Sequence, residues 1–156
     1  MYRKEIPSPL GTILLASDGS SLTGLWFAGQ KHLPDDSQWE ESVLPVFTQT
    51  EQWLSRYFAG ENPNPREIPM APAGSAFQQK VWQLLTQIPY GQLTTYGALA
   101  KQLDCRSAQA VGGAVGRNPI SILIPCHRVV GQTGTLTGYA GGLEKKQFLL
   151  ELEKAI

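Results

Sequence analysis

The 156-residue sequence has only two cysteines and two histidines, and it has no long apolar run. The spacing of these four residues does not match that of a metal site. No segment approaches the roughly 18–20 consecutive apolar residues of a membrane span, and the first ten residues lack the pattern of a signal peptide. We therefore expect free thiols in a reducing cytoplasm, with no metal ion and no membrane contact.

The sequence also lacks an excess of charge of either sign, since 13 Lys and Arg balance 13 Asp and Glu. A net charge of zero argues against a nucleic-acid-binding protein. The total hides a division, however: residues 1–74 carry five basic and nine acidic side chains, and residues 75–156 carry eight and four. A net charge of −4 followed by +4 indicates a basic surface for an anionic partner in the second half. Ordinary solvated faces are the alternative interpretation.

The first half has the pattern of a small β-meander followed by a helix. Residues 12–16 and 22–27 are apolar and flank the turn dipeptide Asp18-Gly19, which predicts a hairpin. Residues 29–42 are polar and predict a loop, in which we expect His32 to be simply exposed. A helix is predicted over residues 46–59, and the proline-rich residues 61–74 indicate an extended linker and a domain boundary.

The second half has the pattern of several short helices. Ser75 can cap a helix that ends near Ile88, and another short helix begins at Thr94 or Thr95. A tight turn at residues 104–106 leads to a helix over 108–116, and two short helices joined in this way predict a helix-turn-helix. The chain closes with an amphipathic helix from residue 143 to about 154. Exposure is the default expectation for its glutamates.

These patterns together predict an α+β fold in two parts. Residues 1–70 form a small β-meander domain with a helix, and residues 71–156 form a mainly helical domain that contains the helix-turn-helix. An apolar content of 42% is sufficient for a packed core. A chain of this length supports one ordinary domain or two small ones that share an interface.

The helix over residues 108–116 has one almost bare face. Gln109, Gly112, Gly113 and Gly116 follow i, i+3, i+4, i+7 spacing, whereas Ala108, Val111 and Val115 fall on the opposite face and are expected to pack inward. Each internal glycine costs a helix up to ~1 kcal/mol relative to alanine. Close packing against another helix would justify that cost. So would contact with nucleic acid, because only a slim helix suits the minor groove, about 6 Å wide.

Residues 121–130, Ser-Ile-Leu-Ile-Pro-Cys-His-Arg-Val-Val, combine β-forming residues with reactive ones. The pattern predicts a buried strand that Pro125 interrupts once. An imidazole and a cation beside a thiol are the usual means of lowering its pKa, which makes Cys126 a candidate nucleophile. Neighbouring strand residues point to opposite faces, so Cys126 and His127 can cooperate only if the backbone bends or a water bridges them. An inert core cysteine is the alternative.

Two flanking segments could complete such a site. Asn118 precedes a proline, which favours an extended or turn-like backbone and leaves the amide side chain free to orient a neighbour. Residues 131–142 form a loop rich in glycine and threonine, with Tyr139 as its only aromatic residue. From composition alone this loop is either a pocket wall or a plain surface loop.

Four segments in one collinear order, between about Phe77 and Glu153, resemble the methylated-DNA–protein-cysteine methyltransferase family, the O6-alkylguanine-DNA alkyltransferases. The segments are IPYGQLTTYGALA, AQAVGGAVGRNPI, IPCHRVVG and LTGYAGGLEKK. The resemblance implies a ribonuclease H-like N-terminal domain and a monomer that binds double-stranded DNA containing O6-alkylguanine. It also implies a recognition helix in the minor groove, a lesion rotated out of the duplex, and no cofactor.

The resemblance further implies a single-turnover reaction in which the alkyl group moves irreversibly onto Cys126. His127 would take the thiol proton through a water, Glu153 would hold the imidazole, and Asn118 would position the site. O4-methylthymine is a second candidate substrate. The implied substrate-binding residues are Tyr96, Val129, Tyr139 and Ala140. The implied DNA-binding residues are Thr94, Thr95, Gln109, Ala110, Gly112, Gly113 and Arg117.

The sequence departs from this family at one position, because Gln109 stands where many members insert an arginine into the base stack. Arg128 is implied to brace the domain interface and not to touch substrate. Three other functions compete: a non-catalytic protein that binds alkylated bases, a cysteine hydrolase, and a DNA-binding regulator. Cys126 argues against the first and third, and the lack of a separate oxyanion device argues against the second.

Overall fold

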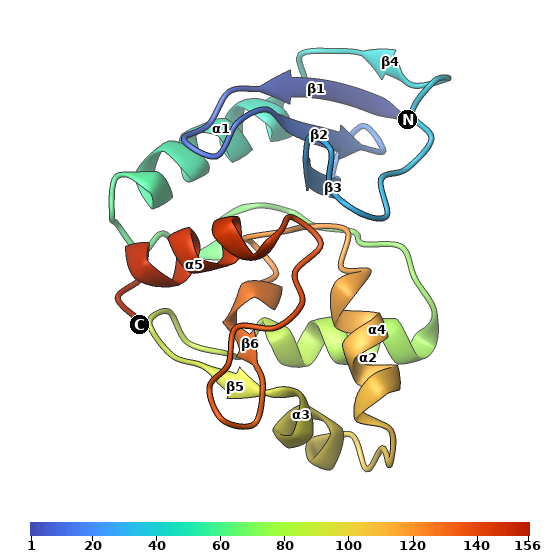
Figure 1. Cartoon of the computed structure of the whole chain (residues 1–156). Coiled ribbons are helices and arrows are strands. Elements are labelled where there is room, and N and C mark those ends of the chain that lie inside the picture. Colours follow the sequence, from blue (N-terminus) through green and yellow to red (C-terminus); the bar gives the residue numbers. More distant parts are fainter.

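The computed structural model describes residues 1–156, and its first half is a sheet covered by one helix (Figure 1). The strand order is β3-β2-β1-β4, in which β1 (Tyr2–Ile6), β2 (Ile13–Ser17) and β3 (Leu22–Phe27) are antiparallel neighbours. Asp18 closes the β2–β3 turn by accepting hydrogen bonds from the amides of Ser20 and Ser21. These strands and α1 (Pro45–Phe58) confirm the predicted meander and helix. The short β4 (Glu40–Glu41), parallel to β1, lies inside the expected loop.

The second half is built of helices that begin where the sequence predicts (Figure 1). They are α2 (Ala76–Leu85), α3 (Tyr96–Gln102), α4 (Ala108–Gly116) and α5 (Leu143–Leu152). Ser75, Thr95 and Ser107 each accept a backbone N–H of the following helix, and Gln78 completes a capping box with Ser75. With α3 and α4 packed as a helix-turn-helix, the predicted α+β class is confirmed.

The predicted buried strand over residues 121–130 is wrong in conformation, although every residue from 120 to 130 is buried. Ile122 has a left-handed backbone with φ +70°, residues 126–128 form the 3-10 helix η2 (Cys126–Arg128), and only β6 (Val129–Val130) is a strand. Local groups satisfy the backbone instead of a partner strand. The Asn118 amide donates to the carbonyls of Ile120 and Ile124, and the Cys126 amide donates to Ile124 O.

The two halves of the chain are joined along the edge strand β3. Leu22 exchanges backbone hydrogen bonds with Pro69 and Ala71, and Leu25 does so with Pro119 and Ser121. These contacts cover what would otherwise be an exposed sheet edge. The linker expected over residues 61–74 is therefore partly pinned to the sheet, and it also contains the 3-10 helix η1 (Pro65–Glu67).

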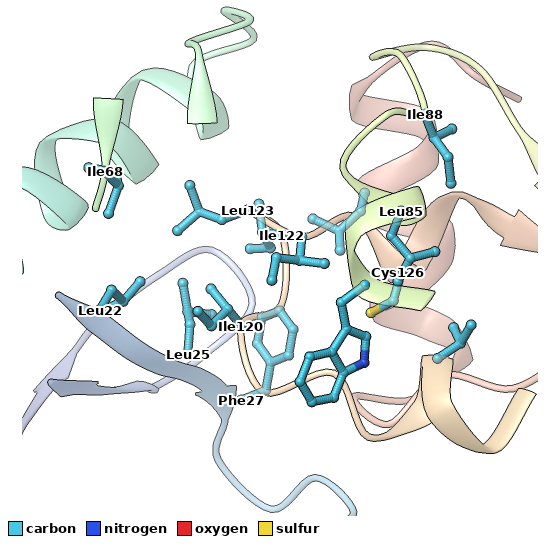
Figure 2. Packing of buried hydrophobic residues seen from close by; sticks show 14 of the residues in the cluster. Leu22, Leu25, Phe27, Ile68, Leu85, Ile88, Ile120, Ile122, Leu123 and Cys126 are labelled. Atoms are coloured by element: carbon cyan, nitrogen blue, oxygen red, sulfur yellow. The ribbon is translucent and has the colours of Figure 1, made fainter. Parts of the chain in front are cut away.

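A single apolar core of 28 buried residues runs through both halves. Figure 2 shows Ile120, Ile122 and Leu123 between Leu22, Leu25 and Phe27 of the sheet and Leu85 and Ile88 from the helical half. Cys126 lies at the helical side of this cluster. None of the helices is both long and apolar enough to cross a bilayer.

We expect the Ser75 cap to stabilise the whole molecule, because α2 packs against α4 in the common core. Ser75→Ala removes the acceptor of the Gln78 amide and should lower the free energy of unfolding by about 1 kcal/mol. Denaturant unfolding measures the change. Ser55→Ala is the matched control, since Ser55 is exposed within α1. It should be neutral or slightly stabilising, and equal losses in the two variants would contradict a capping role.

Candidate active site

Cys126 lies at the start of η2 and borders a cavity of about 190 Å³. The thiol belongs to a residue that is only 7% exposed. Because η2 is a tight helical turn and not a strand, the backbone bends between Cys126 and His127. The backbone is therefore not extended here, and the His127 side chain points to Glu153.

Behind Cys126, four side chains form a buried hydrogen-bonded network around Glu153. The Glu153 carboxylate accepts from His127 Nε2 at 2.7 Å, from Arg128 Nε at 2.8 Å and Nη2 at 3.1 Å, and from Tyr57 Oη at 2.5 Å. Glu153 is 2% exposed, so the default expectation of exposure is wrong for it. Glu153 directly follows α5, and its carboxylate contacts His127 and Arg128 of η2.

The Glu153 carboxylate remains ionised in this buried position. Burial alone would raise its pKa, but the hydrogen bonds and charges of His127 and Arg128 outweigh burial and lower the pKa to about 2. Arg128 also donates to the carbonyl of Ile88 at 2.7 Å and lies over the Tyr90 ring. All these polar contacts of Arg128 lie in the second half of the chain, and Tyr57 supplies the link to the first half.

His127 is positioned to act as a base through Nδ1. Its Nε2 faces the Glu153 carboxylate and therefore carries the proton in the neutral ring, which leaves Nδ1 as an acceptor. His127 Nδ1 is buried and has no hydrogen-bond partner. Burial is the largest single influence on the pKa of His127 and lowers it; the hydrogen bond and charge of Glu153 oppose this, the charges of Arg128 and Lys146 add to the decrease, and the net shift is downward. The imidazole is therefore neutral at physiological pH.

The structure does not show the low thiol pKa that adjacent basic residues led us to expect. Burial raises the pKa of Cys126, and the nearby Asn118 amide and the Lys146 charge offset this only in part. The reason is that both basic neighbours face away from the sulfur: the His127 and Arg128 side chains bond to Glu153. The thiol is thus neutral in the free protein.

Segments from distant parts of the sequence form the cavity walls together with α4: the loop after β3, the start of α3 and the loop before α5. Tyr96, Tyr139 and Ala140, all predicted substrate-binding residues, line it. So do Lys31 and His32 from the loop after β3, which the sequence analysis treated as a plain exposed loop. The Lys31 amide donates to the carbonyl of Ala140 at 3.1 Å and fastens the two loops together.

Lys146, a fully buried lysine in α5, was not among the predicted residues of the site. Its Nζ donates to the carbonyls of Val129, Thr137 and Gly138 at 2.5, 2.8 and 3.1 Å, and so fixes the cavity loop to β6. Burial lowers its pKa to about 8, although the Cys126 side chain opposes this. The sequence contains one signal for it, because residues 146, 149, 150 and 153 share one helical face. The two apolar residues of this face predict that it is buried, and its two charged residues, Lys146 and Glu153, are buried with it.

The remaining predicted residues of the site surround this centre. Asn118 is 4% exposed and braces residues 120–124 through its side chain. The Val129 side chain is fully buried and does not line the cavity, and its carbonyl is held by Lys146. Tyr96 Oη donates to Thr137 O at 3.1 Å.

The bare face of α4 is open to solvent beside the cavity. A Cβ at Gly113 or Gly116 would meet nothing within 4 Å, and one at Gly112 would only touch the Tyr96 ring at 3.8 Å. Gln109, Ala110 and Arg117 are exposed, whereas Thr94 and Thr95 are half-buried near the start of α3. Val111 and Val115 pack inward as predicted. Ala108 does not, because it lies exposed in the first turn.

Together these groups form a site for covalent transfer to sulfur. A thiol borders a cavity, a neutral imidazole with one free nitrogen follows it in sequence, and an ionised carboxylate holds that imidazole from behind. No group of three or more His, Cys, Asp or Glu residues could hold a metal ion. An open, slim helix face lies directly beside the cavity, so a large partner could reach the thiol.

Comparison with known proteins gives consistent matches along the whole chain. A family model for the "6-O-methylguanine DNA methyltransferase, ribonuclease-like domain" matches residues 1–72, and one for the "DNA binding domain" of the same family matches residues 76–155. A methylated-DNA–protein-cysteine methyltransferase of Haemophilus influenzae is 48% identical and covers 99% of this chain and 87% of its own. One from Methanosarcina acetivorans is 44% identical, with 98% of each chain covered.

A solved structure of high similarity is that of Mycobacterium tuberculosis OGT in complex with DNA. It has a TM-score of 0.91 and 42% sequence identity, and it covers 99% of this chain and 94% of that one. The structure of an O6-methylguanine DNA methyltransferase from Methanococcus jannaschii is more distant, with a TM-score of 0.69 and 29% identity over 98% and 94% of the two chains.

We expect Glu153→Gln to lower the free energy of unfolding at pH 7 by about 3–5 kcal/mol, because Arg128 would stay buried without its counter-charge. The folded-state pKa of Glu153, about 2, lies below its ordinary value of 4.5. Its contribution to stability is therefore present above pH 4.5 and is lost as the pH falls towards 2.

Denaturant unfolding of both proteins across this pH range measures the effect, and the gap between parent and variant should narrow with falling pH. Glu151→Gln is the control, since Glu151 is exposed and accepts a hydrogen bond only from Gln147. A gap that is small at pH 7, or that stays constant between pH 4.5 and 2, would contradict the assigned network.

Proposed function

Because the chain belongs to the 6-O-methylguanine DNA methyltransferase family, we propose that it repairs DNA by moving an alkyl group from O6 of guanine onto the sulfur of Cys126. The observation that carries this proposal is the juxtaposition of Cys126, its cavity and the open face of α4. The reaction consumes the protein, because the product is an S-alkylcysteine with no group nearby to remove the alkyl chain. O4-methylthymine is a second candidate substrate.

In the proposed reaction the proton of the Cys126 thiol passes to His127 Nδ1 through a water. The thiolate then attacks the alkyl carbon, the carbon–oxygen bond breaks as the carbon–sulfur bond forms, and the departing guanine takes up the proton that the thiol gave to His127, which returns the imidazole to its neutral form. Tyr96, whose hydroxyl donates to Thr137 O in the free protein, turns to donate towards the guanine as it leaves, and Tyr139 and Ala140 form the wall against which the base lies. Asn118 holds the turn that aims the sulfur.

Charge balance explains why the proton moves within the site and not to solvent. A lone thiolate in this buried position is disfavoured, since burial raises the pKa of Cys126. Transfer to His127 creates a thiolate and an imidazolium together, so the net charge of the site does not change. Glu153 stabilises the imidazolium, and Arg128 keeps Glu153 ionised at the pH of the reaction.

The proposed partner is double-stranded DNA, bound through its minor groove. The bare face of α4 allows close approach of the backbone, and the net charge of +4 on residues 75–156 favours the phosphates. The proposed DNA contacts are those of the resemblance: Thr94, Thr95, Gln109, Ala110, Gly112, Gly113 and Arg117. Gln109 lies exposed in the first turn of α4, where it would act as a neutral wedge when the lesion rotates out of the stack.

We further propose that residues 1–70 and 71–156 are two domains and that the protein acts as a monomer. The first would serve as a scaffold that closes one side of the cavity through Lys31 and His32. The second would carry the DNA contacts and the alkyl acceptor.

Radiolabelled O6-methylguanine in duplex DNA tests the reaction directly. Label should move to the parent protein, at most one methyl group per chain, and Cys126→Ser should abolish the transfer while duplex binding survives. Cys105→Ser is the matched control and should react at the parent rate, because Cys105 lies in the turn before α4 and does not line the cavity. Label on Cys105, or repeated turnover without labelled protein, would exclude the proposed reaction.

Groove approach is tested by adding bulk at Gly113. Gly113→Ala should raise the free energy of unfolding by about 0.5–1 kcal/mol, because a side chain there meets no neighbour. Gly113→Leu should be at least as stable as the parent, yet duplex affinity should fall from Gly to Ala to Leu. Transfer from the free O6-alkylguanine base should change little. Undiminished duplex binding by Gly113→Leu would remove α4 from the DNA interface.

A further inference from the structure

The side chain of Tyr57 reaches from the first half of the chain into the buried network behind Cys126. Tyr57 belongs to α1, is 1% exposed, and donates its hydroxyl to Glu153 Oε2 at 2.5 Å. Three aromatic rings hold it in place. Its ring stacks on Trp53 at 5.5 Å between centroids and meets Phe58 and Tyr90 edge-on at 5.4 and 6.5 Å.

The hydroxyl shares its acceptor with the proposed base. Glu153 Oε2 also accepts from His127 Nε2 and, at 3.1 Å, from Arg128 Nη2, whereas Oε1 accepts only from Arg128 Nε. A phenol that donates to Oε2 neutralises part of the negative charge that His127 faces. Burial and the adjacent Glu153 charge raise the pKa of Tyr57 well above its ordinary value, so the phenol stays a donor at any physiological pH.

We infer that Tyr57 is a positioning residue for the alkyl transfer, and that it sets the basicity of His127 by way of Glu153. The inference rests on the proposed function and deepens it, because it makes the N-terminal half part of the proton-transfer apparatus. Neither a scaffold nor a simple domain contact requires a hydroxyl at this position, since a phenylalanine ring would fill the same apolar space.

The groups that bear on His127 come from every element around it. Glu153 raises its pKa, and the charges of Arg128 and Lys146 lower it. Tyr57 and Tyr90 are the titratable groups of α1 and of the segment before β5 that face Glu153, and Tyr139 lies across the cavity. Among these, Tyr57 and Arg128 donate to the same carboxylate oxygen as His127, and Tyr57 is the only uncharged donor and the nearer of the two, at 2.5 against 3.1 Å.

Removal of the hydroxyl should make His127 more basic. Without the phenol, Glu153 Oε2 carries more negative charge and stabilises the imidazolium better. Transfer needs neutral His127, so the rate falls as the pH drops through the pKa of His127. The acid limb of the pH–rate profile should therefore move to higher pH in Tyr57→Phe, by about half a unit or more.

The measurement uses the whole chain and free O6-alkylguanine as the substrate, so that DNA binding does not contribute to the profile. Site-specific replacement of Tyr57 by 3-fluorotyrosine provides the opposite change in nearly the same shape. Fluorine makes the phenol a stronger donor, so the acid limb should move to lower pH. Tyr90→Phe is the matched control: Tyr90 Oη lies 3.5 Å from Leu152 O and does not contact Glu153, so its limb should stay in place.

A protein with both Glu153→Gln and Tyr57→Phe should have the acid limb of its pH–rate profile at the same pH as the protein with Glu153→Gln alone. Opposite shifts in the two Tyr57 proteins, with none for Tyr90→Phe, would support the inference. An acid limb unmoved by either Tyr57 change would overturn it, even if Tyr57→Phe lowers the stability. Failure of the parent to take up the alkyl group would instead overturn the proposed function, so the two failures are distinguishable.

Discussion

The ionised carboxylate of Glu153 is the group on which the arrangement of the site depends. It accepts hydrogen bonds from residues of α1 and η2 and itself follows α5, so one buried negative charge connects three parts of the fold. A buried carboxylate is costly unless it is paired and fully hydrogen-bonded. Arg128 provides the pairing, and Tyr57 and His127 complete the hydrogen bonds. The same interactions that make the burial of Glu153 tolerable also fix the orientation of the His127 ring.

Local signals were sufficient to predict the helices that begin at a capping residue and the strands that meet at a turn. Ser75, Thr95 and Ser107 cap helices because their side chains bond to backbone groups only three residues away, and such short-range chemistry is legible in sequence. The segment around Cys126 was predicted as a strand because its apolar β-formers indicate burial but not conformation. Ile122 adopts a left-handed backbone there, which no propensity predicts for a β-branched residue.

The centre of the site and the cavity residues Tyr96, Tyr139 and Ala140 were accessible from the sequence, whereas the contributions from the first half of the chain were not. Cys126 and His127 stand out by chemistry, and the resemblance adds Glu153 and Asn118. Tyr57 and Glu153 are 96 residues apart, and Lys31 reaches the cavity through a loop with no regular structure. These contacts depend on how the sheet docks onto the helices along β3. That docking is a tertiary property, and no periodic sequence pattern in either segment predicts it.

A neutral thiol in the free protein is consistent with the proposed single-turnover reaction. A permanently ionised cysteine would react with any electrophile or oxidant that entered the cavity, and a protein that cannot be regenerated would be lost to each such event. Burial keeps the Cys126 thiol neutral in the free protein, and a neutral thiol is a weaker nucleophile than a thiolate. In the proposed reaction, the alkyl carbon then lies against the sulfur as the proton moves to His127. In the proposed reaction, selectivity would therefore come from coupling ionisation of the thiol to occupancy of the cavity, and not from a strongly nucleophilic thiolate held in advance.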